Sequence, residues 1–388
     1  MSGRHRIRGR AVGLSGTWEL RLRDGLIEAM EPVDAPGEGD GERWIGPTLL
    51  DIQVNGAFGI DLQAGDAGPE ALRELSAALA RHGVSQWVPT IITGPPDRLL
   101  RACRAFGEAI EGDAALRACA PGLHIEGPYI SPEDGPRGAH AREHVRPPDA
   151  AEFDRLYEAA RGRILYVTVA PEIPGAAAFI QHCTARGVAV ALGHHLGGAE
   201  DIARAVDAGA RLSTHLGNGI ASMLPRHHNP IWPQLAEDRL YASLIADLHH
   251  LPAPVLKAFV RAKGADRVIF VSDAAPPAGL SPGRYDLAGT PVDLHADGLI
   301  SLAGTDLLAG SGMMLLQGVV NAARATDLSM AEAFRAAREN PARLLRLPTS
   351  AWPPEVGDAA DLIAFDIAGD GTARVREAYV RGRAVLTG

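Results

Sequence analysis

Short apolar runs alternate with segments of helical period from residue 48 onward, and this alternation limits the possible folds more than any other feature of the sequence. Segments in which apolar residues recur every three or four positions lie at 69–81, 176–186, 199–208 and 254–263. The apolar runs that could form buried strands are eight in number: 48–54, 86–92, 119–126, 164–170, 188–193, 211–215, 241–247 and 267–273. Eight strand–helix units over roughly 300 residues predict an α/β fold, a (β/α)8 TIM-like barrel, in preference to a doubly wound sheet.

The two ends of the chain do not follow this pattern. Residues 1–47 have the pattern of short strands broken by turns, and after a last helix near 330–347 the chain returns to strand-like segments. Because an isolated hairpin is barely stable in water, strands at the two ends are expected to join. We therefore expect a small β-sandwich domain built from residues 1–47 together with 350–388, and a barrel domain of residues 48–349.

The composition excludes several classes of protein. Hydrophobic residues make up 46% of the chain and charged residues 22%, which is enough apolar material for a core and unlike a disordered chain. The net charge of −9 disfavours a general surface for nucleic acid or anionic membranes. Three cysteines without paired spacing indicate neither a disulfide framework nor a thiolate metal site. With no membrane-spanning stretch and no apolar core of a signal peptide, a cytoplasmic location is expected.

Most of the apolar runs end in polar side chains. In a barrel of this type the carboxyl ends of all strands meet at one rim, where the chemistry lies. The residues that end the runs are Asp51, Gln53, Asn55, His124, Glu126, His194, His195, His215, Asp247, His249, His250 and Asp273. Singly, each has an ordinary explanation, such as a helix cap or a hydrogen-bonded loop residue. Their coincidence at one rim favours a metal site.

The residue types at this rim predict a particular chemistry. One carboxylate and two imidazoles form a ligand set suited to Zn²⁺ or a similar divalent ion, with a position left for water. Such an ion lowers the pKa of its bound water towards neutrality. Asp273 is a further carboxylate that could accept the proton of this water and return it to a leaving amine. The sequence therefore predicts metal-assisted hydrolysis with Asp273 as the catalytic acid–base.

Motifs along most of the chain also resemble a known family. The matching segments are LLDIQVNGAFGIDL (49–62), GLHIEGPYISPEDGPRGAH (122–140), VTVAPE (167–172), ALGHH (191–195), STHLGNGI (213–220), IADLHHLP (245–252), VSDAAPPAG (271–279), GTDLLAGS (304–311) and GDAADLIAFD (357–366). With these motifs the chain resembles the amidohydrolase superfamily and, within it, the N-acetylglucosamine-6-phosphate deacetylases. The pairing of HIEGP with THLGN is specific, whereas GDAADL is shared more widely.

The resemblance implies that Glu126, His194 and His215 bind one divalent metal ion per subunit. Zn²⁺ is favoured, and such ligands also accept Fe²⁺, Mn²⁺ or Co²⁺. Most amidohydrolases carry His-x-His after the first strand, whereas this chain has Gln53 and Asn55 there, which disfavours a full second metal site. A turn-forming polar pair is an equally compatible interpretation of these two residues.

For the substrate, the resemblance implies contacts from Ala139, His140, Asn218, Gly219, Arg226, His250 and Leu308. His140 could stabilise an oxyanion, and Arg226 and His250 could hold a phosphate group. The alternatives are solvated surface positions for Arg226 and His250 and a core position for Leu308. The resemblance also implies a homodimer, in which Arg226 could serve the pocket of the neighbouring subunit.

Departures from the family lie on the substrate side. Gly219 stands where the family usually has alanine, residues 226–230 read RHHNP in place of Arg-x-Pro-Gly, and Leu248 replaces a glycine. His195 stands where a small hydroxyl residue is common. These changes leave the predicted metal ligands and Asp273 untouched, so the sequence constrains the reaction more than the substrate.

The function expected from the sequence is hydrolysis of an N-acetyl amino sugar, above all N-acetylglucosamine 6-phosphate, to glucosamine 6-phosphate and acetate. Three alternatives stay open. They are a deacetylase of a non-phosphorylated or otherwise modified amino sugar, a cyclic amide hydrolase or deaminase on the same barrel, and a non-catalytic sugar-phosphate-binding protein. Neither a nucleic acid nor a membrane is expected as a partner.

Overall fold

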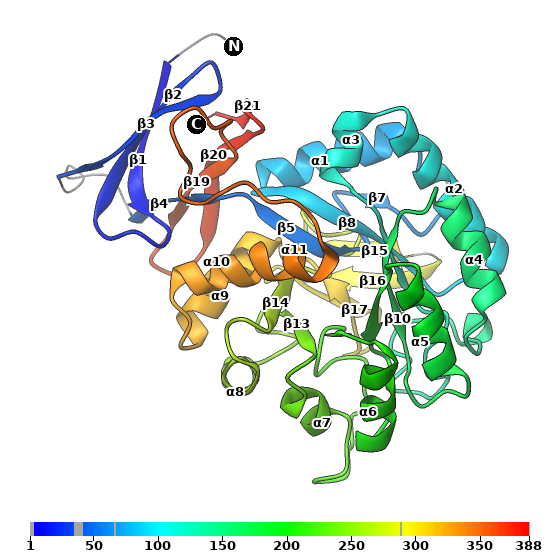
Figure 1. Cartoon of the computed structure of the whole chain (residues 1–388). Helices are drawn as coiled ribbons and strands as arrows, with labels where there is room; N and C mark the ends of the chain where they lie inside the picture. The colour runs from blue at the N-terminus through cyan, green and yellow to red at the C-terminus, as the bar shows by residue number, and fades with distance from the viewer. Residues whose placement is uncertain (1–3, 35–41, 66, 288, 388) are drawn as a thin grey trace.

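An eight-stranded parallel sheet forms the centre of the computed structural model, which describes residues 4–34, 42–65, 67–287 and 289–387 (Figure 1). The hydrogen-bonded order of its strands is β14-β13-β12-β11-β10-β9-β8-β5. Their bounds are β5 (Leu49–Val54), β8 (Val84–Ile92), β9 (Leu123–Glu126), β10 (Ile164–Val169), β11 (Ala189–Leu192), β12 (Leu212–Ser213), β13 (Tyr241–Ile245) and β14 (Val268–Val271). A parallel bridge between Val54 and Ala274 brings the first strand beside the chain that follows the last. All eight predicted strands are present, and the predicted barrel is confirmed.

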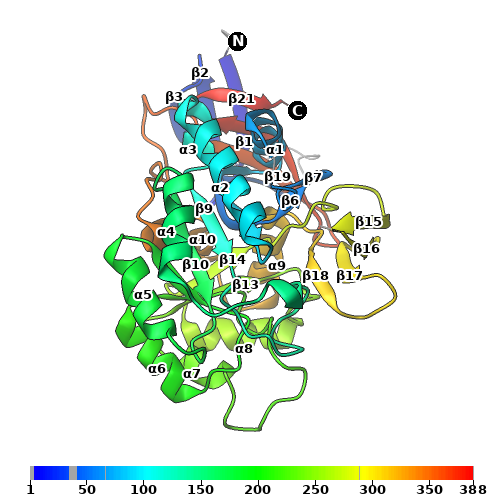
Figure 2. The same cartoon turned by 90° about the vertical axis from the view of Figure 1, so that its right-hand side faces the viewer.

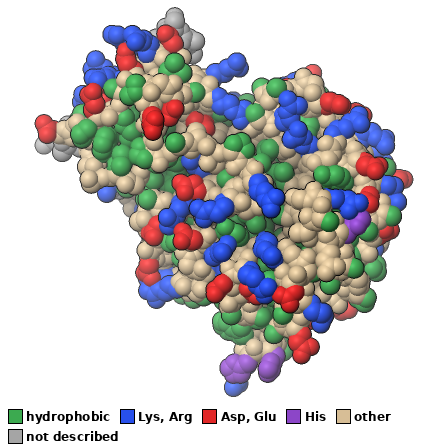
Figure 3. Space-filling view, in the orientation of Figure 1, with side chains coloured by type: hydrophobic (Ala, Val, Ile, Leu, Met, Phe, Trp, Pro, Cys, Tyr) green, Lys and Arg blue, Asp and Glu red, His purple; other side chains and the backbone are tan. Residues whose placement is uncertain are grey.

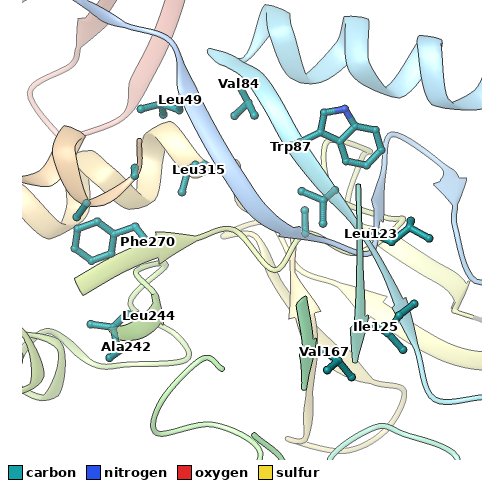
Figure 4. Close-up of a cluster of buried hydrophobic side chains, with 14 of the residues drawn as sticks. Leu49, Val84, Trp87, Leu123, Ile125, Val167, Ala242, Leu244, Phe270 and Leu315 are labelled. Atoms are coloured by element: carbon teal, nitrogen blue, oxygen red, sulfur yellow. The ribbon is translucent and has the colours of Figure 1, made fainter. Parts of the chain in front are cut away.

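The apolar runs form strands because the sheet is covered on both faces. Every described residue of β5, β13 and β14 is buried, as expected for parallel strands between a packed interior and a layer of helices. Figure 4 shows part of the large cluster of buried side chains that includes Trp87, Ile125, Leu244, Phe270 and Leu315. This packing holds the carboxyl ends of the strands in fixed positions.

Helices surround the sheet in Figure 1. Their bounds are α1 (Pro69–Arg81), α2 (Pro96–Glu111), α3 (Ala114–Cys119), α4 (Ala150–Ala159), α5 (Ala176–Ala185), α6 (Ala199–Ala208), α7 (Ile231–Ala236), α8 (Ala253–Lys263), α9 (Leu315–Ala325), α10 (Met330–Ala336) and α11 (Glu339–Leu345), with a short 3-10 helix η1 (Arg142–His144). The four amphipathic segments predicted as helices correspond to α1, α5, α6 and α8, with ends that differ by at most one residue. No helix among the described residues is long and apolar enough to cross a membrane.

The single helix expected near 330–347 is two helices, α10 and α11. Pro341 has no N–H, so a continuous helix would leave the carbonyl of Ala337 without its usual donor. In the structure this carbonyl accepts a hydrogen bond from the backbone N–H of Leu50 at 3.0 Å. The break therefore ties the end of α10 to the first barrel strand.

Strands from both ends of the chain form a second sheet beside the barrel (Figure 1). Its order is β21-β20-β19-β4-β1-β2-β3, and antiparallel pairing of β4 with β19 places Pro47 opposite Leu362. Its strands are β1 (Arg4–Ala11), β2 (Thr17–Arg23), β3 (Leu26–Val33), β4 (Glu42–Pro47), β19 (Leu362–Ile367), β20 (Ala373–Val380) and β21 (Arg383–Leu386). A cluster of buried side chains, among them Ile7, Leu20 and Ile45, supports this sheet. The fold class expected from the sequence, a barrel with a β unit built from both termini, is confirmed.

The exact limits of the two units stay predictions. The described strands of the second sheet end at Pro47, at the first proposed limit, and resume at Leu362, 12 residues after the second proposed limit at 350. Residues 1–3, 35–41 and 388 of the predicted β domain lie outside the described residues.

A small antiparallel sheet follows the last barrel strand and was not expected from the sequence. It consists of β15 (Gly283–Leu287), β16 (Thr290–Leu294), β17 (Leu299–Leu302) and β18 (Leu308–Ser311). Figure 2 shows these strands to one side of the barrel, and the two-residue strands β6 (Gly56–Ala57) and β7 (Ile60–Asp61) also pair. The N–H of Ser311 donates to the carbonyl of Asp273 at 2.9 Å, so this sheet contacts the rim where the polar residues gather.

Candidate functional site

A cavity of about 460 Å³ opens at the carboxyl ends of the barrel strands. Glu126 is the last residue of β9. His194, His215 and Asp273 each lie two positions after the end of a strand, β11, β12 and β14 respectively. All four line the cavity, together with most of the predicted substrate residues, namely Ala139, His140, Asn218, Gly219, His250 and Leu308.

The three predicted metal ligands converge on one point. Glu126 Oε1 lies 3.2 Å from His194 Nε2 and 3.0 Å from His215 Nε2, and the two Nε2 atoms are 3.1 Å apart. Ligand atoms about 2.0–2.2 Å from a tetrahedral Zn²⁺ are roughly 3.4 Å from one another. The spacing of the three atoms therefore fits a single divalent ion between them.

Hydrogen bonds and burial set the protonation of the ligand cluster. His194 Nδ1 lies 2.8 Å from the carbonyl of Pro136, which can only accept, so Nδ1 carries a proton, and loss of the Nε2 proton exposes a lone pair beside Glu126. Burial opposes ionisation of Glu126, but hydrogen bonds from His194 and His215 outweigh it and hold the pKa of Glu126 well below its usual value. The site thus presents an anionic carboxylate with imidazole nitrogens.

Strained backbone is concentrated at these positions. The φ angles are +54° at His194, +29° at His215 and +53° at Asp273, in the left-handed region that residues with side chains seldom adopt. Such conformations cost on the order of 1–3 kcal/mol each and persist where the surrounding structure enforces them. All three turn their side chains into the cavity directly after a strand.

Two amide side chains of β5 and its following residue hold Asp273. Gln53 Nε2 donates to Asp273 Oδ1 at 3.0 Å, and Asn55 Nδ2 donates to the same oxygen at 2.7 Å. Gln53 Nε2 also lies 3.2 Å from Glu126 Oε1. Burial, followed by repulsion from Glu126, raises the pKa of Asp273 to about 6. Asp273 is therefore a buried carboxylate whose Oδ1 is held by two donors.

The roles of Gln53 and Asn55 are not those of a turn-forming pair. Their side chains are buried and connect the predicted acid–base to the ligand cluster. The signal that could have found them is the period of two along a strand, because Asp51, Gln53 and Asn55 alternate with apolar residues and so share the barrel interior.

His140 is near enough to the cluster for two roles. One ligand atom each of Glu126, His140 and His194 lies within 4.8 Å of the others, which is a possible metal site in itself, and the rings of His140 and His194 are 4.3 Å apart. Burial lowers the pKa of His140 well below its usual value, so its ring is neutral. Its Nδ1 lies 2.8 Å from Thr93 Oγ1. The Thr93 hydroxyl also has the carbonyl of Glu126 as an acceptor at 3.5 Å, and when it donates the shorter bond to His140 Nδ1, His140 Nε2 carries a proton towards the cavity.

The remaining predicted substrate residues divide into two groups. His250 lines the cavity, and its Nδ1 lies 2.7 Å from Asp247 Oδ2, which also accepts from Ser311 Oγ at 3.0 Å. Leu308 begins β18 and is half-buried at the cavity wall rather than in the core. Arg226 does not line the cavity of its own chain, and it lies exposed in the loop before α7.

Two histidines that are adjacent in sequence to cavity residues do not line the cavity themselves. His195 is buried beside His194 and hydrogen-bonds Gln234 of α7. His249 Nε2 lies 3.1 Å from the carbonyl of Asp297. Neither lines the cavity, so their presence in the sequence motifs adds no group to the site.

Comparison with known proteins agrees with this geometry. The sequence pattern of the Amidohydrolase family matches residues 44–385. The chain belongs to the amidohydrolase family. Members of this family generally bind a divalent metal. In this chain the carboxylate of Glu126 and the imidazoles of His194 and His215 are ligand atoms suitable for such an ion.

Several relatives of this amidohydrolase have names. The chain is 31% identical to the N-acetylgalactosamine-6-phosphate deacetylase of Escherichia coli O157:H7, over 93% of this chain and 95% of that protein. It is 34% identical to the human N-acetylglucosamine-6-phosphate deacetylase, over 89% of this chain and 84% of the relative. The structure of the N-acetyl-D-glucosamine-6-phosphate deacetylase of Mycobacterium smegmatis has a TM-score of 0.83 at 28% identity, and covers 95% of this chain and 96% of its own. The similarity to amino sugar phosphate deacetylases thus extends over nearly the whole chain.

Proposed function

We propose that this amidohydrolase removes the acetyl group from an N-acetyl amino sugar 6-phosphate, with N-acetylglucosamine 6-phosphate as its main substrate. Water is consumed, and the products are glucosamine 6-phosphate and acetate. The observation that carries this proposal is the convergence of Glu126, His194 and His215 beside Asp273 in one cavity of about 460 Å³. The deacetylase relatives support the choice of an acetamide on an amino sugar.

Glu126, His194 and His215 would hold one divalent ion, with Zn²⁺ favoured. When bound, such an ion supplies Lewis-acid polarisation of the amide carbonyl and activates water near neutral pH. The Gln53 and Asn55 amides occupy the positions of the His-x-His pair of other amidohydrolases, and they bind poorly as ligands compared with imidazole. One ion per subunit is therefore the stoichiometry that we propose.

Asp273 would move the proton of the reaction. Its Oδ1 is held by Gln53 and Asn55, which leaves Oδ2 to accept a proton from the attacking water. The same oxygen would then donate this proton to the sugar nitrogen as the amide bond breaks, so that the carboxylate is regenerated. His140 would donate its Nε2 proton to the developing oxyanion, with Thr93 fixing the ring.

The phosphate site would be completed by a second subunit. His250, oriented by Asp247, lines the cavity, whereas Arg226 lies exposed outside the cavity of its own chain. A guanidinium pairs with a phosphate group through two parallel hydrogen bonds. We therefore propose a homodimer in which Arg226 reaches the partner's cavity. The cytoplasmic location stays a prediction from the sequence.

N-acetylgalactosamine 6-phosphate is a second candidate substrate, because the Escherichia coli relative is named for this epimer. Acetate release would be measured on metal-reconstituted protein with N-acetylglucosamine 6-phosphate, its galactosamine epimer and unphosphorylated N-acetylglucosamine, and ring opening of a cyclic ureide would be followed separately by chromatography. We expect the phosphorylated glucosamine derivative to give the highest kcat/KM. Hydrolysis of the cyclic ureide alone, or of no compound, would contradict the proposal.

A further inference from the structure

A second cavity, of about 300 Å³, lies between the barrel and the terminal sheet. We call it the junction cavity and define it by Thr48, Ser85, Arg338, Ser350, Asp361 and Arg381 among its lining residues. Thr48 and Ser85 lie next to the first residues of β5 and β8, at the amino ends of the barrel strands. The junction cavity is therefore at the opposite end of the barrel from the candidate active site.

Two guanidinium groups line the junction cavity without a carboxylate partner. Arg338 is only 4% exposed, and no carboxylate oxygen lies within 4.0 Å of it in the described part of the chain. Its Nη2 donates to the carbonyl and the Oγ of Ser350 at 2.7 and 2.6 Å. Arg381 donates to the carbonyl of Ala118, and it likewise forms no ion pair among the described residues. Figure 3 shows further basic side chains on the face that carries α10 and α11.

The one acidic residue of the junction cavity accepts hydrogen bonds from two hydroxyl groups of the same cavity. Asp361 Oδ1 accepts from Thr48 Oγ1 at 3.0 Å, and Oδ2 accepts from Ser350 Oγ at 3.0 Å. Ser85 Oγ donates in turn to Thr48 Oγ1 at 2.7 Å. Two arginines and one aspartate leave a net charge of +1 beside these hydroxyl groups.

A buried cation without a paired anion is unfavourable, because desolvation is not compensated. Burial accordingly lowers the pKa of Arg338, and the carboxylates of Asp361 and Glu339 only partly oppose this effect. An anion in the junction cavity would remove the imbalance. A guanidinium group presents several N–H donors in a planar fork, a geometry that suits phosphate oxygens.

We propose that the junction cavity binds a small phosphate-bearing anion. The cavity exceeds the volume of one phosphate group and lies at the lower end of the range of small-molecule sites, which leaves space for a small ester. Arg338 precedes α11, and Arg381 lies in the turn between β20 and β21. The bound anion would therefore join the barrel to the terminal sheet and stabilise the folded chain.

The test compares two variants of equal charge change. Arg381 has φ +50°, which asparagine tolerates, so Arg381→Asn removes the guanidinium and keeps the backbone. Arg383→Gln is the matched control, because Arg383 is exposed on β21 and does not line the cavity. Beside this matched pair, Arg338→Gln tests the buried position and should lose the same anion as Arg381→Asn. Binding of radiolabelled orthophosphate and of glucosamine 6-phosphate is measured by equilibrium dialysis on the full chain, with chloride keeping the ionic strength constant.

We expect saturable binding to wild type and Arg383→Gln, and loss of one bound anion per chain, or at least a tenfold higher Kd, in Arg381→Asn. Any site in the catalytic cavity would remain in all variants, with an unchanged KM for the sugar phosphate. Binding of glucosamine 6-phosphate but not of orthophosphate at the Arg381-dependent site would identify a phosphate ester as the occupant. Equal stoichiometry and Kd in Arg381→Asn and Arg383→Gln, or no saturable binding to wild type, would overturn the proposal.

Discussion

Asp273 is the residue on which the proposed chemistry depends most directly. Its Oδ1 accepts hydrogen bonds from Gln53 and Asn55, and an asparagine at position 273 could still accept both while lacking a basic oxygen. We therefore expect Asp273→Asn to lower kcat by roughly 10²–10⁴, the usual contribution of a general acid–base. Metal content, measured by elemental analysis, should stay at the wild-type value. Near wild-type acetate release from Asp273→Asn would remove Asp273 from the mechanism.

Asn55 acts on the reaction only through Asp273, so its substitution should have a different signature. Asn55→Leu removes the 2.7 Å donor to Asp273 Oδ1 at similar side-chain volume. A donor to the ionised form lowers the pKa of a carboxylate, so its loss raises the pKa of Asp273. The acid limb of the kcat/KM profile should move to higher pH, with kcat lower by about tenfold at neutral pH. An unchanged profile with reduced kcat would indicate a purely structural role for Asn55.

Asp51 lies beneath the site and affects stability. It accepts from the N–H groups of Gln53 and Ser272, and burial raises its pKa to about 7. The pKa of Asp51 is higher in the folded chain than in the unfolded chain. Its contribution to the free energy of unfolding is therefore full at low pH and is lost as the pH rises towards 7. Asp51→Asn keeps the acceptor and cannot ionise, so the variant should gain about 2–3 kcal/mol relative to wild type between pH 5 and pH 8. Chemical unfolding at both pH values measures the change, and a pH-independent difference would contradict it.

Some residues of the site could be predicted from the sequence and others could not. Four residues of the site could be predicted because each ends an apolar run, and a barrel brings the ends of its strands together. They are Glu126, His194, His215 and Asp273. In the pairs His194-His195 and His249-His250, sequence does not show which imidazole faces the cavity, since that depends on backbone turns such as the φ of +54° at His194. Arg226 was named as a phosphate ligand, yet its distance from its own cavity depends on a loop that sequence does not specify.

At the scale of elements, burial decided what could be predicted. The barrel strands are buried on both faces and so appear as continuous apolar runs, whereas β15 and β16 are largely exposed and have no such pattern. The joint between α10 and α11 was missed because helical periodicity continues across it, and only Pro341 marks the break. The small sheet matters for function, because β18 carries Leu308 to the cavity wall.

The small sheet has its own apolar cluster, and Ile300 lies fully buried within it. Ile300→Ala should destabilise this sheet by about 2–4 kcal/mol, because a buried Ile loses packing and leaves a cavity. Since β18 also contacts Asp273 through Ser311, KM for the sugar phosphate should rise more than kcat falls. The exposed Leu26, replaced by alanine, is the control and should change stability by less than about 0.5 kcal/mol. If the kcat and KM of Ile300→Ala matched those of wild type, the small sheet would have no role in substrate binding.

The whole molecule depends on pairings between distant parts of the chain. β4 and β19 pair although more than 300 residues separate them, as the bond between Thr48 Oγ1 and Asp361 Oδ1 across 313 positions also shows. Sequence predicted that the ends would join, because an isolated hairpin at one end would be barely stable in water. It did not show which strands pair, since their alternating patterns allow several registers. The junction cavity has walls from both units, since Arg381 of the terminal sheet and Arg338, which precedes α11, both line it.

Shared active sites can be tested at the level of the assembly. If Arg226 serves the partner's cavity, then Arg226→Ala and Asp273→Asn damage different halves of each composite site. A heterodimer of the two variants contains one site with both residues intact, formed by Asp273 of the first chain and Arg226 of the second. Co-expression at equal levels gives heterodimers as half of the population, so about a quarter of wild-type activity on the phosphorylated sugar should return. Activity no higher than the mean of the two parent homodimers would show that Arg226 does not act across a subunit interface.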